Sequence, residues 1–197
     1  MAALYDSAPL LGKEATEAAL RERIDTADVI HLATHGCTDP RRAMSSGLLL
    51  ATSEKHDENG GTDNDSVLQA WEIYSQLKLK AELVVLSACD TGRGQAIAGE
   101  GLIGLTRALQ YAGARSVVSS LWTADDQSTL TLMVAFHRNL RNGDAKDEAL
   151  RRAMESVRKD PRSSHPYYWA AFYLTGDPDN PSLGNQAYRP ELQAAAH

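Results

Sequence analysis

The sequence has few cysteines, and this limits what sulfur chemistry it can support. Among 197 residues there are two, Cys37 and Cys89. They could form at most one disulfide, and a cytosolic chain of this size neither needs such a bond nor would keep it oxidised. We therefore expect the cysteines to act as free thiols.

The sequence also lacks the features of membrane and secreted proteins. No apolar stretch approaches the roughly 20 residues of a membrane span, and the N-terminus lacks the basic and then apolar build of a signal peptide. These absences predict a cytoplasmic protein with no membrane partner.

Clustered basic charge is the third missing feature. The formal net charge is -6, and the basic pairs Arg41-Arg42 and Arg151-Arg152 are short and lie among acidic residues. Phosphate binding depends on clustered Lys and Arg, so nucleic acid is not expected as a partner.

The chain has no internal repeat, and its length with 43% hydrophobic residues predicts one domain with a proper core.

Apolar runs alternate with helical patterns along the chain. The runs predict strands at Val29–Thr34, Leu83–Leu86, Ser116–Trp122 and Tyr167–Leu174, with a short strand or hairpin at Leu48–Leu50. Apolar spacing predicts helices over Lys13–Arg23, Leu68–Leu77, Leu102–Ala112, Leu130–Leu140 and Ala149–Val157. This order predicts an α/β fold with a mostly parallel sheet and helices on both faces.

Two of the predicted strands end on reactive side chains. Val29–Thr34 leads to His35, and Leu83–Leu86 leads to Cys89. If the two strands are neighbours about 4.8 Å apart, the side chains meet at the carboxyl edge of the sheet. A histidine can take the thiol proton and return it to a leaving amine, while the thiolate attacks. Backbone N–H groups of Gly36 and Cys89 could then stabilise the oxyanion.

Other interpretations of these residues remain open. A buried cysteine is most often a small hydrophobic residue, and His31, inside its strand, fits a core histidine better than a base. His31, His35 and Cys37 could suggest a metal site, but Gly36 interrupts the strand and no fourth ligand has zinc-like spacing. The glycine-rich stretch after Cys89 lacks the Gly-Lys-Ser/Thr of a phosphate loop. The sequence therefore predicts neither a metal nor another cofactor.

Six sequence blocks together resemble the CHAT domain, a caspase-like domain associated with tetratricopeptide repeats in bacteria. They occur in the family's order and cover most of residues 10–177: His31–Gly36, Leu83–Gly92, Gly99–Gly101, Gly113–Val118, Ser120–Trp122 and His165–Phe172. The resemblance implies a CHAT domain over residues 1–176, followed by a flexible tail at 177–197. It also implies a caspase-like three-layer sandwich, with His35 and Cys89 as the protease dyad and Cys37 outside the pattern.

The resemblance carries two expectations about partners. Members usually follow repeat domains that receive a signal, so a regulatory repeat-domain partner is implied, although this chain has no such repeats. The chain also starts near the family's second strand, at Leu4–Leu11, and so lacks the first strand and helix. That would leave one edge of the Val29–Thr34 strand unpaired and available for self-association.

The predicted function is a cysteine endopeptidase that cleaves protein or peptide substrates with His35 and Cys89. An extended substrate would lie near Ser120 and Trp122. Glu100, Asp125 and Asp126 could line an acidic pocket and favour a basic residue before the cut, although helix capping or a solvated charge explains each equally well. The alternative is a catalytically silent interaction module with the same fold.

Overall fold

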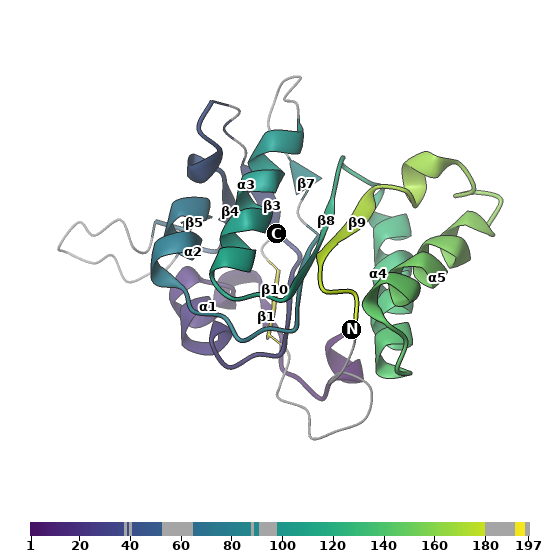
Figure 1. The fold of residues 1–197 in the computed structure, drawn as a ribbon, viewed down its shortest axis with the longest axis horizontal. Helices are drawn as coiled ribbons and strands as arrows, with labels where there is room; N and C mark the ends of the chain where they lie inside the picture. The colour runs from purple at the N-terminus through teal and green to yellow at the C-terminus, as the bar shows by residue number, and fades with distance from the viewer. Residues whose placement is uncertain are drawn as a thin grey trace.

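The computed structural model describes residues 1–37, 39, 41–52, 65–87, 89–90, 98–179 and 192–195, with the backbone alone for 89–90, 98–102 and 192–195. These residues form a mixed α/β architecture of two sheets and five α-helices (Figure 1). Short 3-10 helices lie at Ala2–Leu4 (η1), Gly12–Glu14 (η2), Ala43–Ser45 (η3) and Pro166–Tyr168 (η5).

The larger sheet has six strands and is mostly parallel, as predicted. Its order across the sheet is β1 (Leu10–Leu11), β10 (Leu192–Ala195), β2 (Val29–Leu32), β6 (Leu83–Leu86), β8 (Ser116–Ser120) and β9 (Phe172–Gly176). Only β8 and β9 pair antiparallel. Every residue of β2 and β6 is buried, which explains why their sequences are continuous apolar runs rather than alternating ones.

Helices cover both faces of this sheet (Figure 1). On one side lie α1 (Glu17–Ile24), α2 (Ala70–Gln76) and α3 (Ala98–Tyr111). On the other lie α4 (Asp126–Arg141) and α5 (Lys146–Arg158), which pack against each other. None of the helices in the described ranges is long and apolar enough to cross a membrane.

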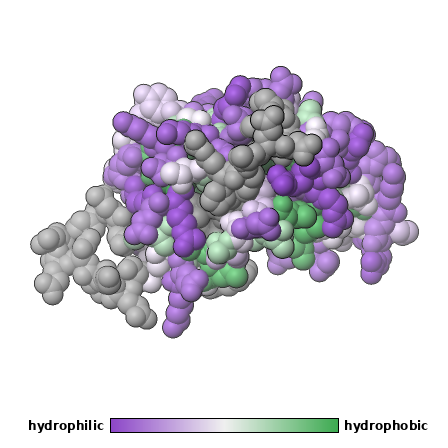
Figure 2. Space-filling view, turned by 90° about the horizontal axis from the view of Figure 1, so that it is seen from below, coloured by the Kyte–Doolittle hydropathy of each residue, from purple (hydrophilic) through white to green (hydrophobic). Residues whose placement is uncertain are grey.

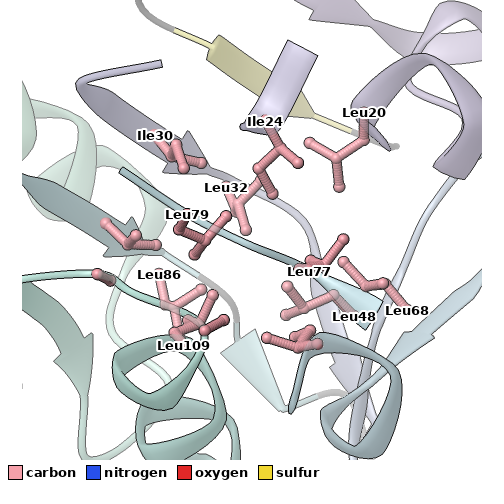
Figure 3. Packing of buried hydrophobic residues seen from close by; sticks show 14 of the residues in the cluster. Leu20, Ile24, Ile30, Leu32, Leu48, Leu68, Leu77, Leu79, Leu86 and Leu109 are labelled. Atoms are coloured by element: carbon pink, nitrogen blue, oxygen red, sulfur yellow. The ribbon is translucent and has the colours of Figure 1, made fainter. Parts of the chain in front are cut away.

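Alternate residues of the central strands feed two separate hydrophobic cores. Ile30 and Leu32 point to the α1 side, where they meet Leu20 and Ile24 (Figure 3). Val29 belongs to the core under α4 and α5. The outer surface is mostly hydrophilic in the view of Figure 2, with only small hydrophobic areas. Burial of these two apolar faces is what holds the helices on the sheet.

A second, four-stranded sheet continues from the carboxyl end of the first. Its order is β5 (Val67–Gln69), β4 (Gly47–Leu49), β3 (His35–Cys37) and β7 (Cys89–Asp90). The predicted short strand at Leu48–Leu50 is confirmed as β4, which pairs antiparallel with β3 and β5. The strand predicted over Val29–Thr34 ends at Leu32, and His35 starts a new strand in the other sheet.

Two predicted elements start later than expected. The helix predicted from Leu68 starts at Ala70, because Gln69 and Glu72 form a capping box there and Val67–Gln69 joins the second sheet. The strand predicted from Tyr167 starts at Phe172. Pro166 favours a 3-10 turn, and the His165 Nδ1 atom accepts the Tyr167 N–H at 3.2 Å.

Part of the expected tail forms a strand that covers the expected free edge, while residues 180–191 and 196–197 lie outside the described residues. Leu192–Ala195 form β10, which lies parallel between β1 and β2 rather than in a flexible tail. The edge of β2 expected to be unpaired is therefore occupied by this chain's own C-terminal segment. The physical reason is that a buried strand edge needs hydrogen-bond partners for its backbone groups, and any segment of the chain that can reach it can supply them.

Candidate active site

His35 and Cys89 are direct partners in the backbone register of the second sheet. Strand β3 pairs with β7 in parallel, with His35 opposite Cys89 and Gly36 opposite Asp90. Neighbouring strands lie about 4.8 Å apart. The backbone thus brings together the two residues that the sequence pairs as a dyad, which lie 54 positions apart.

The apolar strands before these residues set that register. Strands β2 and β6 pair in parallel, with Leu32 opposite Leu86. His35 follows Leu32 by three residues, and Cys89 follows Leu86 by three. The pairing register of the first sheet therefore continues into the second. The Ser87 N–H donates to the Leu32 carbonyl at 3.0 Å and continues the pairing past the end of β6. The buried runs therefore determine which residues meet at the site.

A cavity of about 330 Å³ opens beside His35. His35 itself is exposed. The strand ends contribute His31, Ala33, Thr34, His35 and Ser87, and the rest of the lining comes from Met1 and from α4 through Asp126, Thr129, Leu130 and Met133. The lining therefore combines apolar side chains with hydroxyl, imidazole and carboxyl groups, which is the usual make-up of a ligand pocket.

His31 lies at the base of this cavity and is 1% exposed. Its Nε2 atom is 2.7 Å from Ser87 Oγ, and its Nδ1 atom is 2.8 Å from His137 Nε2. The prediction of a satisfied core histidine is thus confirmed. Burial lowers the pKa of His31 to about 4, so the ring is neutral at pH 7 and is a weak base compared with an ordinary histidine.

Gly36 and Cys37 lie inside the second sheet. Gly36 is buried in β3, opposite Leu48 of β4 and Asp90 of β7. Cys37 is half-buried, has a free thiol and lies opposite Gly47. Within the described ranges, no three His, Cys, Asp or Glu side chains come together in a way that could hold a metal ion.

The residues predicted to bind substrate are spread around this end of the sheet. Ser120 is buried at the end of β8, and the Trp122 indole N–H donates to the Tyr167 carbonyl at 3.1 Å. Asp125 accepts the Ser128 N–H at 2.9 Å as the N-cap of α4. Glu100 lies in α3, with its side chain outside the described atoms. The acidic side chain that shares the cavity with His35 is Asp126.

The sequence patterns did not identify three polar residues in or next to this site. Ser87 stands two positions before Cys89, and Thr129 lies on α4 in the cavity wall. His137 lies within the helix predicted over Leu130–Leu140 and is completely buried. A histidine in an otherwise apolar stripe is the one signal that could have pointed to a buried partner, because a buried imidazole needs hydrogen bonds.

The chain is similar to known proteins over most of its length. A family model described as "CHAT domain" matches residues 1–177. Tetratricopeptide repeat protein 28 of Mus musculus is 29% identical over 193 residues, and the protein of the same name from Homo sapiens is 30% identical over 193 residues. Each match covers 85% of this chain but spans only 8% of the relative's length. The match to the family model over residues 1–177 shows that this chain belongs to the CHAT domain family.

Proposed function

We propose that the chain is a cysteine endopeptidase with a caspase-like three-layer α/β sandwich, in which Cys89 is the nucleophile and His35 the acid-base. The register of β3 and β7, which sets His35 opposite Cys89, is the observation that carries the proposal. The exposure of His35 and the cavity beside it support access for a substrate.

The proposed reaction has two halves. His35 takes the proton of the Cys89 thiol, and the thiolate adds to the carbonyl carbon of the scissile bond. His35 then protonates the leaving amine, and the C–N bond breaks to give a thioester with Cys89. In the second half His35 takes a proton from a water molecule, which attacks the thioester carbon. The C–S bond then breaks, and His35 returns the proton to the Cys89 sulfur, so that the acid product leaves and the free thiol forms again.

The oxyanion and substrate roles are part of the same proposal. The backbone N–H groups of Gly36 and Cys89 are the proposed oxyanion donors. An extended peptide would lie near Ser120 and Trp122 at the end of β8. The acidic residues Glu100 and Asp125 are proposed to favour a basic side chain before the cut.

The proposed regulatory partner is a repeat domain. Both mammalian relatives are named tetratricopeptide repeat protein 28, and this chain spans 8% of the length of each. A superhelical repeat array offers an extended binding surface. We therefore propose that such an array, in the same or another polypeptide, controls access to the dyad.

An interaction module without catalysis is the second candidate, and one surface feature favours it. Tyr74 on α2 and Tyr111 on α3 stack with ring centroids 3.9 Å apart while 44% and 66% exposed. Trp71, also on α2, is 37% exposed. Exposed aromatic groups of this kind are typical of protein-binding surfaces.

Cleavage profiling on a diverse peptide library tests the proposal. The wild type should cut a subset of peptides, whereas Cys89→Ala and His35→Ala should lose at least about a thousandfold in rate, because each removes one member of a unit. Cys37→Ala is the matched control, since this thiol lies in β3 two residues past His35, and it should retain its rate. A thiol-reactive peptide probe should label the wild type but not Cys89→Ala. A folded wild type that neither cuts nor reacts would favour the interaction module.

A further inference from the structure

The exposed large hydrophobic side chains gather on one surface of the molecule. The part of the chain that the structure describes has nine of them, and five lie on α2, α3 and the short helix η3: Met44, Trp71, Tyr74, Ile103 and Tyr111. Single hydrophobic residues scattered over a surface are normal, whereas a group of them marks a site of interaction. We name these five residues the aromatic surface.

The packing of the helices brings the aromatic surface together. The helices α2 and α3 lie side by side on the same face of the sheet (Figure 1), and η3 packs on both. Ile103, Arg107 and Tyr111 follow one another at intervals of four residues, so they lie on one face of α3. The Tyr111 ring stacks on that of Tyr74 at an interplanar angle of 20°, which joins this face to α2.

The charge around the aromatic surface is positive. Arg107 lies between the two hydrophobic residues of α3, and Lys78 and Lys80 follow α2; all three side chains are exposed. The N–H of Leu79, between the two lysines, donates to the Ala112 carbonyl at 2.6 Å, which places the lysines beside the end of α3. None of these three cations forms an ion pair with a described residue.

Acidic side chains do not balance this charge locally. Residues 70–80 contain one acid, Glu72, which is 1% exposed and pairs with Arg21 at 3.1 Å. Residues 103–111 contain no acid. The whole chain has a formal net charge of -6, so a local excess of three positive charges departs from its composition. Such a surface is complementary to a partner of negative charge.

We propose that the aromatic surface docks an acidic polypeptide segment that carries aromatic or aliphatic anchor side chains. The anchors pack on the stacked tyrosines and on Trp71, and the carboxylates of the partner pair with Arg107 and the two lysines. Trp, Tyr and Arg are the residue types that contribute most to binding energy in protein interfaces. The dyad lies on β3 and β7, so this proposal does not rest on the peptidase function.

The number of cations favours a polypeptide over an anionic lipid surface. Basic segments that bind anionic lipids carry about four to eight clustered Lys and Arg residues, whereas three cations border five hydrophobic side chains here. Nucleic acid binding likewise depends on many contacts between cations and phosphates. A polypeptide needs fewer ion pairs, because a few well-packed anchors supply most of its binding energy.

Panning a displayed library of random peptides on the Cys89→Ala chain tests the proposal. This variant keeps the aromatic surface and, under the proposed function, cannot cut the peptides. The selected sequences should combine Asp or Glu with aromatic or aliphatic residues. Their Kd, measured by fluorescence anisotropy, should rise as NaCl increases from about 0.05 to about 0.5 M, because salt screens exposed ion pairs.

Substitutions on the surface should weaken the binding of the selected peptides. In the Cys89→Ala chain, Tyr111→Ser should raise Kd at least about tenfold, because it removes an aromatic anchor. Arg107→Glu should raise Kd about 3- to 10-fold at low salt and less at high salt. The matched controls are Leu11→Ser on β1 and Arg138→Glu on α4, both at exposed positions outside the surface, and they should leave Kd unchanged.

Several results would overturn the proposal. Panning that enriches no peptide, or only peptides without acidic residues, contradicts the stated partner. Peptides that bind folded Tyr111→Ser and Arg107→Glu as tightly as the parent bind elsewhere. Vesicles that contain phosphatidylserine should not bind, and binding that Tyr111→Ser abolishes would make the occupant a lipid surface. Should Tyr111→Ser fail to fold, Ile103→Ser takes its place. None of these results depends on whether the wild type cuts peptides.

Discussion

His31 and His137 lie in contact at the centre of the molecule, with Nδ1 of the first 2.8 Å from Nε2 of the second and ring centroids 5.1 Å apart. Their rings are nearly parallel, at 29°. Both side chains are almost completely buried. Burial lowers the pKa of both rings, and two positive charges at this distance would repel each other, so the folded state favours two neutral imidazoles.

We expect this pair to make the protein sensitive to mild acid. The pKa of His31 is about 4 in the folded chain and near 6.5 in the unfolded chain. Between these values the unfolded chain binds a proton that the folded chain does not. The stabilisation is therefore complete above about pH 6.5 and is lost as the pH falls toward 4, by about 3 kcal/mol for His31. Urea unfolding between pH 7.5 and 4.5 measures the slope.

The matched variant for this prediction is His31→Gln. Its free energy of unfolding at pH 7 should be lower than that of the wild type, but its slope between pH 6.5 and 4.5 should be flatter. Carboxylates such as Glu148, whose pKa the hydrogen bonds from Arg151 and Arg152 lower to about 2, are present in both chains, so their contribution to the slope cancels in the comparison. Equal slopes for the variant and the wild type would contradict the prediction.

Arg21 forms ion pairs with two buried carboxylates. Its guanidinium contacts Glu17 at 2.6 Å and Glu72 at 3.1 Å, and the side chains of these acids are 0% and 1% exposed. Burial raises the pKa of Glu17 in spite of the lowering effect of Arg21. Arg21→Met should lower the free energy of unfolding by about 3–5 kcal/mol, because it leaves buried charge uncompensated. Arg158→Met, at an exposed ion pair on α5, should cost less than about 1 kcal/mol.

Gly113 and Gly143 form a matched pair for backbone strain. Both have positive φ, +121° and +94°. A Cβ at Gly113 would lie 2.2 Å from the Leu79 carbonyl oxygen, whereas one at Gly143 would meet nothing within 4 Å. Gly143→Ala should therefore cost about 1–2 kcal/mol from the conformation alone. Gly113→Ala should cost at least about 2 kcal/mol more because the backbone must move, and equal losses in thermal or urea unfolding would refute the predicted clash.

Removal of β10 should expose the edge of β2. Deleting residues 192–197 takes away the partner of Ile30, His31 and Leu32 in the sheet. The uncovered edge should either lower the free energy of unfolding or cause self-association, which light scattering detects. Deleting only residues 196–197 is the control. A truncated chain that stays monomeric and as stable as the control would show that β10 does not seal the sheet.

Local sequence determined much of the fold and located the two dyad residues. The continuous runs of β2 and β6 fit only a sheet covered on both faces, because every residue of each strand is buried. His35 lies three residues after Leu32, and Cys89 lies three residues after Leu86. If Leu32 pairs with Leu86, these equal spacings therefore predict that His35 lies opposite Cys89. Helix periodicity likewise predicted the helix that carries the buried His137. These features depend only on residues close together in the sequence, so hydrophobic periodicity could predict them.

Tertiary structure decided the features that depend on segments far apart in the chain. The start of a second sheet at His35 requires β4 and β5 as partners, and the closing of the β2 edge by Leu192–Ala195 depends on which segment reaches that edge. The hydrogen bonds that join Ser87, His31, His137 and Tyr5 connect residues up to 132 positions apart. Hydrogen-bond partners of buried polar groups have no sequence period, because folding pairs whichever donors and acceptors it brings within about 3 Å.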